Sequence, residues 1–513
     1  MATMSFFGSF PGLSKRGSSS APMRAKPAIN PKGDLLGFDL LFSLAHMSAL
    51  AAAGVPRDKL VHLTAALPAS TAPYFQEVER IAKGMSYQYA EACRIVGEQV
   101  HDEEAKGLLL RLAGAMDTGE NESDFLEGEA QVQAEAYGNA YERDLETLKK
   151  WTDAFTALIV SASLIVVVAT VSTMIYDLGT SVVGGLVLTT MLISVLGVWV
   201  IYRSAPRELR TLRGPPGRRS QARTRSMMAM LLPAALVLVA VILLLKLNFG
   251  YAMIGFGLTT FPIGVVARRL DRSVTRVDGD ISTFLRVLGA TMGAIGTTAV
   301  VAMSRLDMRS MPSLADGVRQ LSTRLHARVS PQRSWDRFVD DTGSEIVSRS
   351  VRVFLDGTNL GGDPEEVGKR ASLLGSKITQ LRAKRRLVSD TFMYLSMAMQ
   401  AVISFLLIFI VEIVSGFNEL IAVAGLGVAG GVEAAMGSVL AFNLENLRFL
   451  QVAMVPVVVV LTLVNAIAPK VAGGDYSLTI FYYLGISAVL GGAAFVAAPI
   501  LGDLIFGVSA IGL

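Results

Sequence analysis

The sequence predicts an all-α polytopic membrane protein in which two cytoplasmic helical bundles each continue into transmembrane helices. Composition, a series of long apolar stretches and an internal repeat predict this fold class. The 513 residues are 52% hydrophobic and 18% charged, and the mean hydropathy is +0.48. Such a chain is too apolar for a soluble protein of this size and too charged to lie wholly in lipid. It must therefore alternate between lipid and water.

Seven apolar stretches are long enough to cross a bilayer, which takes about 20 residues of helix. In chain order they are 154–176, 181–202, 227–247, 250–267, 393–411, 450–469 and 479–501. Short turns join the first to the second and the third to the fourth, which predicts two helical hairpins. The Gly-rich stretch 420–442, interrupted by Glu433, is either a further span or an amphipathic segment outside the lipid. We therefore expect about seven to nine spans.

The placement of arginine predicts the orientation of these spans. The segment 203–226 holds eight arginines against the single acid Glu208, and four more arginines follow the fourth span. Because cytoplasmic loops carry the excess of Lys and Arg, both segments are expected in the cytoplasm. We expect a multi-pass protein of the cytoplasmic membrane with a cytoplasmic N-terminus. The basic loop either only sets this topology, with anionic lipid headgroups as partners, or docks another protein.

An internal repeat relates the two halves of the chain. Three pairs of residues share one spacing of 242 positions: Phe42 and Phe284, Gly54 and Gly296, Gly119 and Gly361. In each copy an apolar helix ends near glycine, and a later turn starts a long charged helix that runs without a breaker into a span. Movement of a bundle is thus expected to be transmitted to the span that shares its last helix.

These boundaries divide the chain into seven segments. They are a flexible N-terminus (1–33), a first cytoplasmic bundle (34–153), a transmembrane hairpin (154–202), a basic cytoplasmic loop (203–226), a second hairpin (227–268), a second cytoplasmic bundle (269–392) and a C-terminal transmembrane region (393–513).

Motifs for catalysis or metal binding are absent from the sequence. Cys93 is the only cysteine, the four histidines do not form H-E-x-x-H, and no G-x-x-x-x-G-K-[ST] occurs. His46 lies on an apolar helix face and is interpreted as a buried structural histidine. We therefore predict no enzyme activity, no cofactor, no metal and no nucleic-acid partner. A secondary transporter built on the repeat is the alternative, but it predicts inverted spans and charges at the membrane midplane.

Two strings carry a family resemblance: LFSLAHMSALAAAGVPRDKLV (41–61) and LLLRLAGAMDTGENESDFLEGEAQVQAEAYGNAYERDLETLKKW (108–151). They resemble the first half of the FlaJ/ArlJ family of archaellum and archaeal type IV pilus platform proteins, within the type II secretion F-domain superfamily. GTNLGGDPEEV (357–367) and the basic helix after it resemble the second F domain. The resemblance covers about 35–505.

The resemblance implies a platform on which a type IV pilus-like filament is assembled. A hexameric secretion ATPase would dock on the F domains and drive insertion of archaellin or pilin subunits, and the platform would be a homodimer. The sequence leaves open whether the filament is an archaellum or an adhesive pilus and which F domain contacts the ATPase.

Basic residues near the membrane edge are the candidate ATPase-docking surface, and the alternative is that they only set topology. They are Lys149, Lys150, Arg207, Arg210, Arg213, Arg218, Arg219, Arg223, Arg382, Lys384, Arg385 and Arg386.

Overall fold

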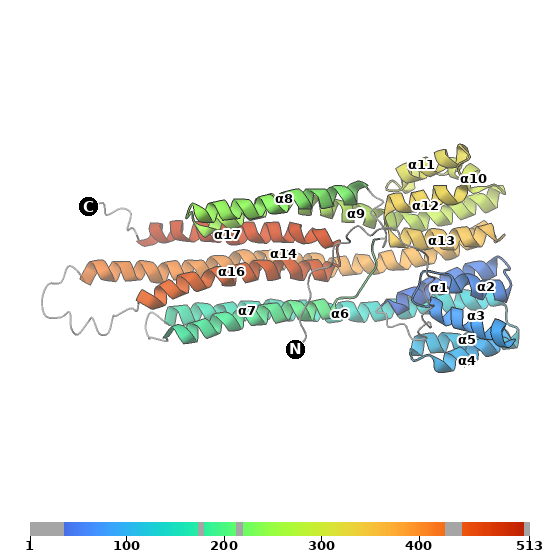
Figure 1. The fold of residues 1–513 in the computed structure, drawn as a ribbon, viewed down its shortest axis with the longest axis horizontal. Helices are drawn as coiled ribbons and strands as arrows, with labels where there is room; N and C mark the ends of the chain where they lie inside the picture. The colour runs from blue at the N-terminus through green and yellow to red at the C-terminus, as the bar shows by residue number, and fades with distance from the viewer. Residues whose placement is uncertain (1–34, 173–178, 212–218, 426–443, 507–513) are drawn as a thin grey trace, which may run out of the picture.

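A computed structural model describes residues 35–172, 179–211, 219–425 and 444–506. Within these ranges the regular elements are α-helices and two short 3₁₀ turns, with no strand beyond one isolated bridge between Thr211 and Ser344. The predicted fold class, an all-α polytopic membrane protein, is confirmed. Two helical bundles lie at one end of an elongated sheaf of long helices (Figure 1).

The first bundle consists of five helices and the start of a sixth. They are α1 (Leu36–Ala52), α2 (Arg57–Ala65), α3 (Ala72–Met85), α4 (Tyr89–Gln99), α5 (Glu103–Thr118) and α6 (Glu122–Ser172). Apolar residues at helical spacing, such as Leu40 and Leu44 in α1 and Leu108 and Leu112 in α5, are buried together in its core. Burial raises the pKa of the Cys93 thiol to about 12, so this cysteine is a packing residue.

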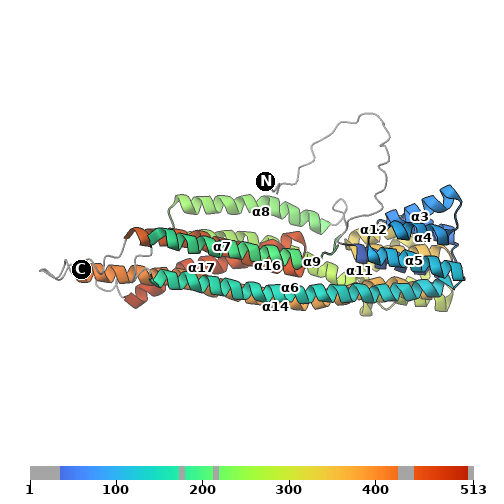
Figure 2. The ribbon, with the colours of Figure 1, turned by 90° about the horizontal axis from the view of Figure 1, so that it is seen from below.

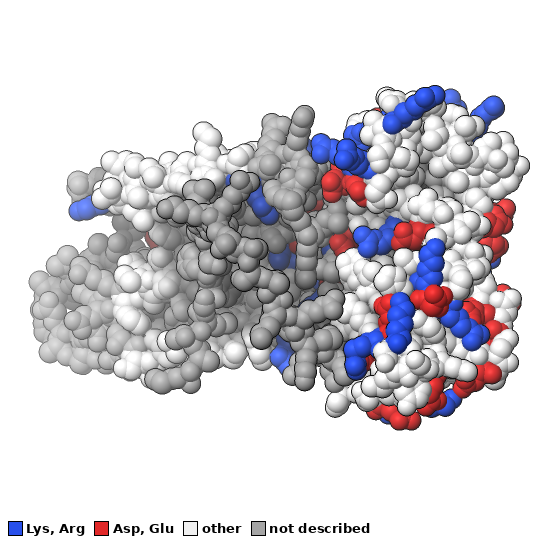
Figure 3. Space-filling view, turned by 45° about the vertical axis from the view of Figure 1, so that its right-hand side comes forward, with Lys and Arg blue, Asp and Glu red and all other residues white. Residues whose placement is uncertain are grey.

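The second bundle is built in the same order. Its helices are the C-terminal half of α9 (Phe249–Ile295), α10 (Ala299–Arg305), η1 (Met308–Ser310), α11 (Ala315–His326), α12 (Pro331–Thr342), α13 (Glu345–Asn359) and the start of α14 (Pro364–Gly425). Phe284, Trp335 and Phe338 pack ring against ring in its core. On the face of the molecule in Figure 3, acidic and basic side chains gather on the bundle end.

Seven described helices are long and apolar enough to cross a membrane. They are α6, α7 (Gly179–Ser204), α8 (Arg219–Leu244), α9, α14, α16 (Leu444–Gly473) and α17 (Ile480–Phe506). They correspond to the seven apolar stretches of the sequence. Of the further stretch at 420–442, residues 420–425 belong to α14 and the rest lies outside the described residues. Helices α6 and α14 pack against each other, and α6 lies in front of α14 in the view of Figure 2.

Helix α9 extends beyond the fourth span. That span was expected at 250–267, and α9 runs unbroken from Phe249 to Ile295. Pro262 lies inside it, and the charged stretch that follows the apolar one contains Gly279 without a break in the helix. A change from apolar to charged residues alters which solvent a helix meets but does not end it. Consequently α6, α9 and α14 are each shared between a bundle and the spans.

The backbone repeats the 242-residue spacing. Gly54 and Gly296 end their helices with φ of +67° and +62°, and Gly119 and Gly361 have φ of +72° and +92°. These left-handed conformations favour glycine, which explains why glycine marks the repeat. The long helices α6 and α14 begin at Glu122 and Pro364, which are also 242 residues apart.

The two bundles share part of one core. Phe38 and Phe42 of α1 are buried with residues of the second bundle. The Arg349 guanidinium of α13 lies 4.5 Å and 4.7 Å from the centres of these two rings and pairs with Asp39 of α1. His46 is fully buried, as predicted, and its Nε2 lies 2.9 Å from Oδ2 of Asp356. The bundles therefore pack as one unit.

Among the spans, close backbone approach and polar contacts set the packing. A Cβ added to Gly257 of α9 would lie 2.7 Å from the carbonyl oxygen of Gly485 in α17, so only glycine fits there. Between α14 and α16, the Asn465 side-chain amide donates to Oε1 of Gln400 at 2.7 Å, and Gln400 donates to Thr462 at 3.0 Å. These contacts fix α17 on α9 and α16 on α14.

Candidate functional site at the junction of bundles and spans

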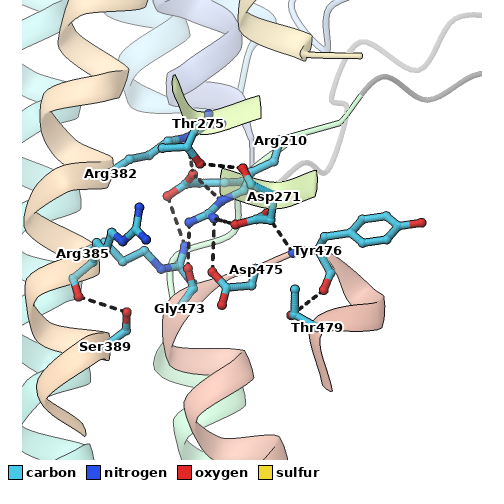
Figure 4. A network of polar contacts seen from close by, with 12 residues as sticks. Arg210, Asp271, Thr275, Arg382, Arg385, Ser389, Gly473, Asp475, Tyr476 and Thr479 are labelled. Carbon is cyan, nitrogen blue, oxygen red and sulfur yellow. Dashed lines mark hydrogen bonds and ion pairs between the residues drawn. The ribbon is translucent and has the colours of Figure 1, made fainter. Parts of the chain in front are cut away.

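The chain that leaves α7 passes between the bundles and the spans and meets a buried cluster of charges there. Seven residues form this cluster, called the ionic junction below: Arg210, Arg382, Arg385, Glu208, Asp271, Asp278 and Asp475. They come from the segment 205–211, from α9, from α14 and from the turn between α16 and α17 (Figure 4).

Glu208 is the central acid. Its Oε2 accepts from Arg382 Nε at 2.8 Å and its Oε1 from Arg385 Nη1 at 3.1 Å, while Arg210 Nε lies 3.7 Å away. The Tyr141 hydroxyl of α6 also donates to this carboxylate. Burial alone would raise the pKa of Glu208, but the positive charges of the three arginines outweigh it and lower the pKa to about 2. Glu208 is therefore ionised at neutral pH.

Arg210 joins the loop to α9 and to the turn after α16. Its Nη1 lies 3.6 Å from Asp271 of α9 and 3.4 Å from Asp475, and its Nη2 donates to the Gly473 carbonyl at 2.7 Å. The backbone N–H of Tyr476 donates to Asp271 at 3.1 Å. One guanidinium thus connects three separate segments at the edge of the spans (Figure 4).

Arg382 extends the junction into the second bundle. Its Nη1 donates to Asp278 of α9 at 2.7 Å, and the Ser344 hydroxyl at the start of α13 donates to the same carboxylate. The backbone N–H of Glu345 donates to the Arg210 carbonyl at 3.3 Å. The loop that follows α7 is thereby fixed to α9, α13 and α14 together.

Arg385 caps the carboxyl end of α16. Its Nε donates to the Ala472 carbonyl at 2.8 Å, its Nη2 to Val471 at 3.2 Å and its Nη1 to Pro206 at 2.7 Å. A cation is favourable at this end because the last carbonyls of a helix lack partners and carry partial negative charge. Gly474 has φ of +64°, and a Cβ there would lie 2.6 Å from the Arg385 guanidinium. Glycine is therefore required beside this arginine.

The ionic junction holds several helices together. Buried charges are stable only when paired and hydrogen-bonded, and removal of one partner costs about 3–5 kcal/mol. Among the described residues, no group of His, Cys, Asp and Glu side chains is arranged to hold a metal ion. The junction instead ties α14, which belongs to the second bundle, to α9, α16 and the chain leaving α7.

The structure separates the sequence-predicted basic residues into three sets. Lys149, Lys150, Arg207, Lys384 and Arg386 are exposed. Lys384 pairs with Glu142 of α6 at 2.6 Å, and Arg386 lies 3.5 Å from Asp390. Arg213 and Arg218 lie outside the described residues, as do the side chains of Arg219 and Arg223.

The third set corrects the expectation of one exposed basic surface. The side chains of Arg210, Arg382 and Arg385 are 14%, 6% and 2% exposed and pair with carboxylates inside the molecule. They are not available to a docking partner, because their guanidinium groups already neutralise buried acids.

Sequence reasoning did not find the acidic half of the ionic junction. Glu208 gave one signal, because it is the only acid among the arginines of 203–226. Asp475 lies in the turn after α16, and its pairing with Arg210 was not foreseen. Asp271 and Asp278 lie seven residues apart in α9 and so share a helix face, which is a second signal.

Fold and site define a class of protein: a polytopic helical membrane protein whose two packed bundles are joined to the spans by shared helices and a buried ionic junction. The chain is similar to flagella accessory protein J of Methanococcus voltae, with 24% identity over 321 residues, which cover 60% of this chain and 56% of the relative. It is also 24% identical over 307 residues to flagella accessory protein J of Methanocaldococcus jannaschii, covering 58% of this chain and 55% of that protein.

These matches confirm the predicted resemblance to FlaJ proteins. The matched region spans a little over half the length of each relative. No protein-family model matches the chain, so its membership of the wider F-domain superfamily stays a prediction. No solved structure matches the chain.

Proposed function

We propose that the chain is a platform of the cytoplasmic membrane for the assembly of an archaellum or a related type IV pilus-like filament. In this proposal the bundle end faces the cytoplasm, the two bundles are the F domains, and a hexameric secretion ATPase docks on them. ATP-driven movement of the bundles would lift archaellin or pilin subunits into the filament. The platform has no catalytic role of its own and acts as a homodimer on the axis of the ATPase.

The observation that carries the proposal is the ionic junction on shared helices. Helix α14 has 62 residues, so at about 1.5 Å per residue it is about 93 Å long and reaches from the bundle through the membrane. At its passage into the spans, Arg382 and Arg385 bind α9, the loop after α7 and the end of α16. A push on the second bundle is therefore passed to several spans at once.

The docking surface in this proposal consists of the basic residues that remain exposed near the junction, namely Lys149, Lys150, Arg207, Lys384 and Arg386. Their positive charge would face an acidic surface of the ATPase. Exposed charges contribute mainly to the rate and specificity of association, and salt weakens their effect.

The test is recovery of the ATPase with the tagged platform from detergent-solubilised membranes. Lys384→Glu together with Arg386→Glu is expected to reduce the recovered ATPase several-fold while membrane insertion is unchanged. Lys246→Glu is the control, because Lys246 is exposed in the turn between α8 and α9, far along the chain from Lys384 and Arg386. If wild-type membranes yield neither the ATPase nor filament subunits, the platform proposal is wrong. If they do and the double variant recovers as much ATPase as wild type, only the docking surface is wrong.

A further inference from the structure

A cavity of about 900 Å³ lies beside the ionic junction, between the bundles and the spans. Its walls come from the start of α1, the loop before α3, the segment after α7, α13 and the end of α16. Cavities that hold small organic ligands measure about 300–1,000 Å³, so this one has room for a ligand. Platform function does not require such a space, and the proposed docking surface does not use it.

The cavity lies where apolar spans end. Lys470 is in the last turn of α16, directly after an apolar stretch that crosses the membrane, and it lines the cavity. Tyr202, near the end of α7, lines it too and is 58% exposed. Lys and Tyr side chains at the ends of spans mark the interface between hydrocarbon and water. A ligand in the cavity would therefore be within reach of the membrane surface.

Each acid of the cavity wall is paired with an arginine. Four carboxylates line it, and each has an arginine partner: Asp39 and Glu345 with Arg349, Glu208 with Arg385, and Asp475 with Arg210. Asp475 acts electrostatically on Lys470, but Arg210 and the Tyr483 hydroxyl, at 2.7 Å, hold it. The Lys470 ammonium therefore has no carboxylate of its own.

Two polar groups of the wall lack a partner within the described part of the chain. The Lys470 ammonium makes no hydrogen bond and has no carboxylate within 4.0 Å. The Ser70 hydroxyl oxygen is buried and makes no hydrogen bond either. A buried hydroxyl without a partner costs about 1–3 kcal/mol, so a ligand that supplies an acceptor is favoured. An ammonium and a hydroxyl are both donors to phosphate oxygens.

We propose that this cavity binds the phosphate headgroup of an anionic membrane lipid, with Lys470 as the cation that neutralises it and Ser70 as an additional donor. A lipid is favoured over free phosphate because the cavity lies where apolar spans end and is much larger than one phosphate ion requires. Basic pockets between spans are known to accept lipid headgroups on this chemical basis. Because Arg385 and Asp475 also line the cavity, an occupied site would stabilise the ionic junction.

The experiment measures lipid retention by the full-length protein reconstituted in phosphatidylcholine vesicles with and without phosphatidylglycerol, then extracted and analysed by mass spectrometry. Wild type is expected to retain phosphatidylglycerol in preference to phosphatidylcholine. Lys470→Met is expected to lower that retention about fivefold, and Lys470→Arg to keep it. Lys150→Met is the matched control, since Lys150 is exposed on α6 toward the same end of the spans and does not line the cavity.

Three results would overturn the proposal. Equal retention of phosphatidylglycerol by wild type and Lys470→Met means that Lys470 does not bind the lipid and only helps to set the membrane topology. An equal loss in Lys150→Met means that surface charge in general attracts the lipid. Inorganic phosphate that displaces the retained lipid, or that stabilises the protein in a Lys470-dependent way when phosphatidylglycerol does not, means that the site takes a free anion.

A labelling measurement on wild type keeps the test independent of variant folding. Phosphatidylglycerol is expected to protect Lys470 from an amine-reactive reagent, whereas Lys150 is labelled equally with both lipids. Equal labelling of Lys470 in the two lipids would contradict the site.

Discussion

The two long helices α6 and α14 occupy equivalent places in the repeat, yet only α14 brings arginines into the ionic junction. The residues 242 positions before Arg382 and Arg385 are Ala140 and Arg143 of α6. Ala140 carries no charge, and Arg143 is exposed. The Tyr141 hydroxyl of α6 donates a hydrogen bond to Glu208. The second bundle is thus joined to the spans by buried ion pairs, whereas the first contributes one hydroxyl to the same acid.

The two copies of the repeat therefore differ in how firmly they are joined to the spans. Buried ion pairs with several hydrogen bonds allow few alternative arrangements, because each broken contact leaves a charge without a partner. A single hydroxyl contact and exposed ion pairs break at much lower cost. Because the bundles pack as one unit, movement of that unit is expected to pass more directly to the spans of the second copy than to those of the first.

The largest expected effect comes from exchanging the two repeat-equivalent arginines for methionine. Arg385→Met leaves the last carbonyls of α16 and part of Glu208 without a donor, and should lower the free energy of unfolding by about 3–5 kcal/mol. Arg143→Met removes an exposed charge and should cost less than about 1 kcal/mol. Thermal unfolding of the purified variants in detergent measures both. Equal losses would remove the distinction between the copies.

The next effect is the pH dependence that Glu208 gives to the junction. Its pKa falls from 4.5 to about 2 in the folded protein, so its contribution to stability is fully present above about pH 4.5 and is lost as the pH falls toward 2. Glu208→Gln should therefore be less stable than wild type by a constant margin from pH 8 to 5, and the margin should shrink below pH 4.5. The measurement is the melting temperature of both proteins across this range. A margin that grows on acidification would show that Glu208 is protonated in the folded state.

Substitution of Gly474 gives a smaller effect that is specific to the second copy. Gly474 and Gly54 both have a left-handed backbone, which destabilises an L residue by about 1–2 kcal/mol. Gly474→Ala and the control Gly54→Ala are therefore both expected to lose this much stability. Only at Gly474 does the added Cβ also approach the Arg385 guanidinium, at 2.6 Å, whereas Gly54 has open space around it. Gly474→Ala should therefore be the less stable of the two in denaturant unfolding. A larger loss for Gly54→Ala would contradict the tight packing at the junction.

The smallest effect is expected for the exposed ion pair between α6 and α14. Lys384→Met should lower stability by less than about 1 kcal/mol, because both Lys384 and Glu142 are about half exposed to water. Even this loss should disappear at about 1 M salt, where charges are screened within about 3 Å. Unfolding at low and high salt checks it. A salt-independent loss above that size would mean that the two helices are held as firmly as the junction.

The sequence predicts the spans, the repeat and the continuity of α6 and α14 well, because these follow from apolar length and from breakers such as Gly119 and Gly361. The continuity of α9 was missed, because a change from apolar to charged residues after Ala267 resembles the end of a span. The ionic junction was missed for a different reason. An arginine that sets topology and an arginine that neutralises a buried acid give the same local pattern, and only the tertiary contacts of Arg382 and Arg385 distinguish them.

The most direct test of the ionic junction is amide hydrogen exchange across it in wild type, Arg385→Met and Arg143→Met. Exchange reports local opening, which should be rare where ion pairs hold the backbone. We expect faster exchange in Arg385→Met at 205–211 and 471–478 together, with Arg143→Met unchanged from wild type. Exchange that stays at the wild-type rate in Arg385→Met, or that rises equally in Arg143→Met, would contradict a stiff joint specific to the second bundle.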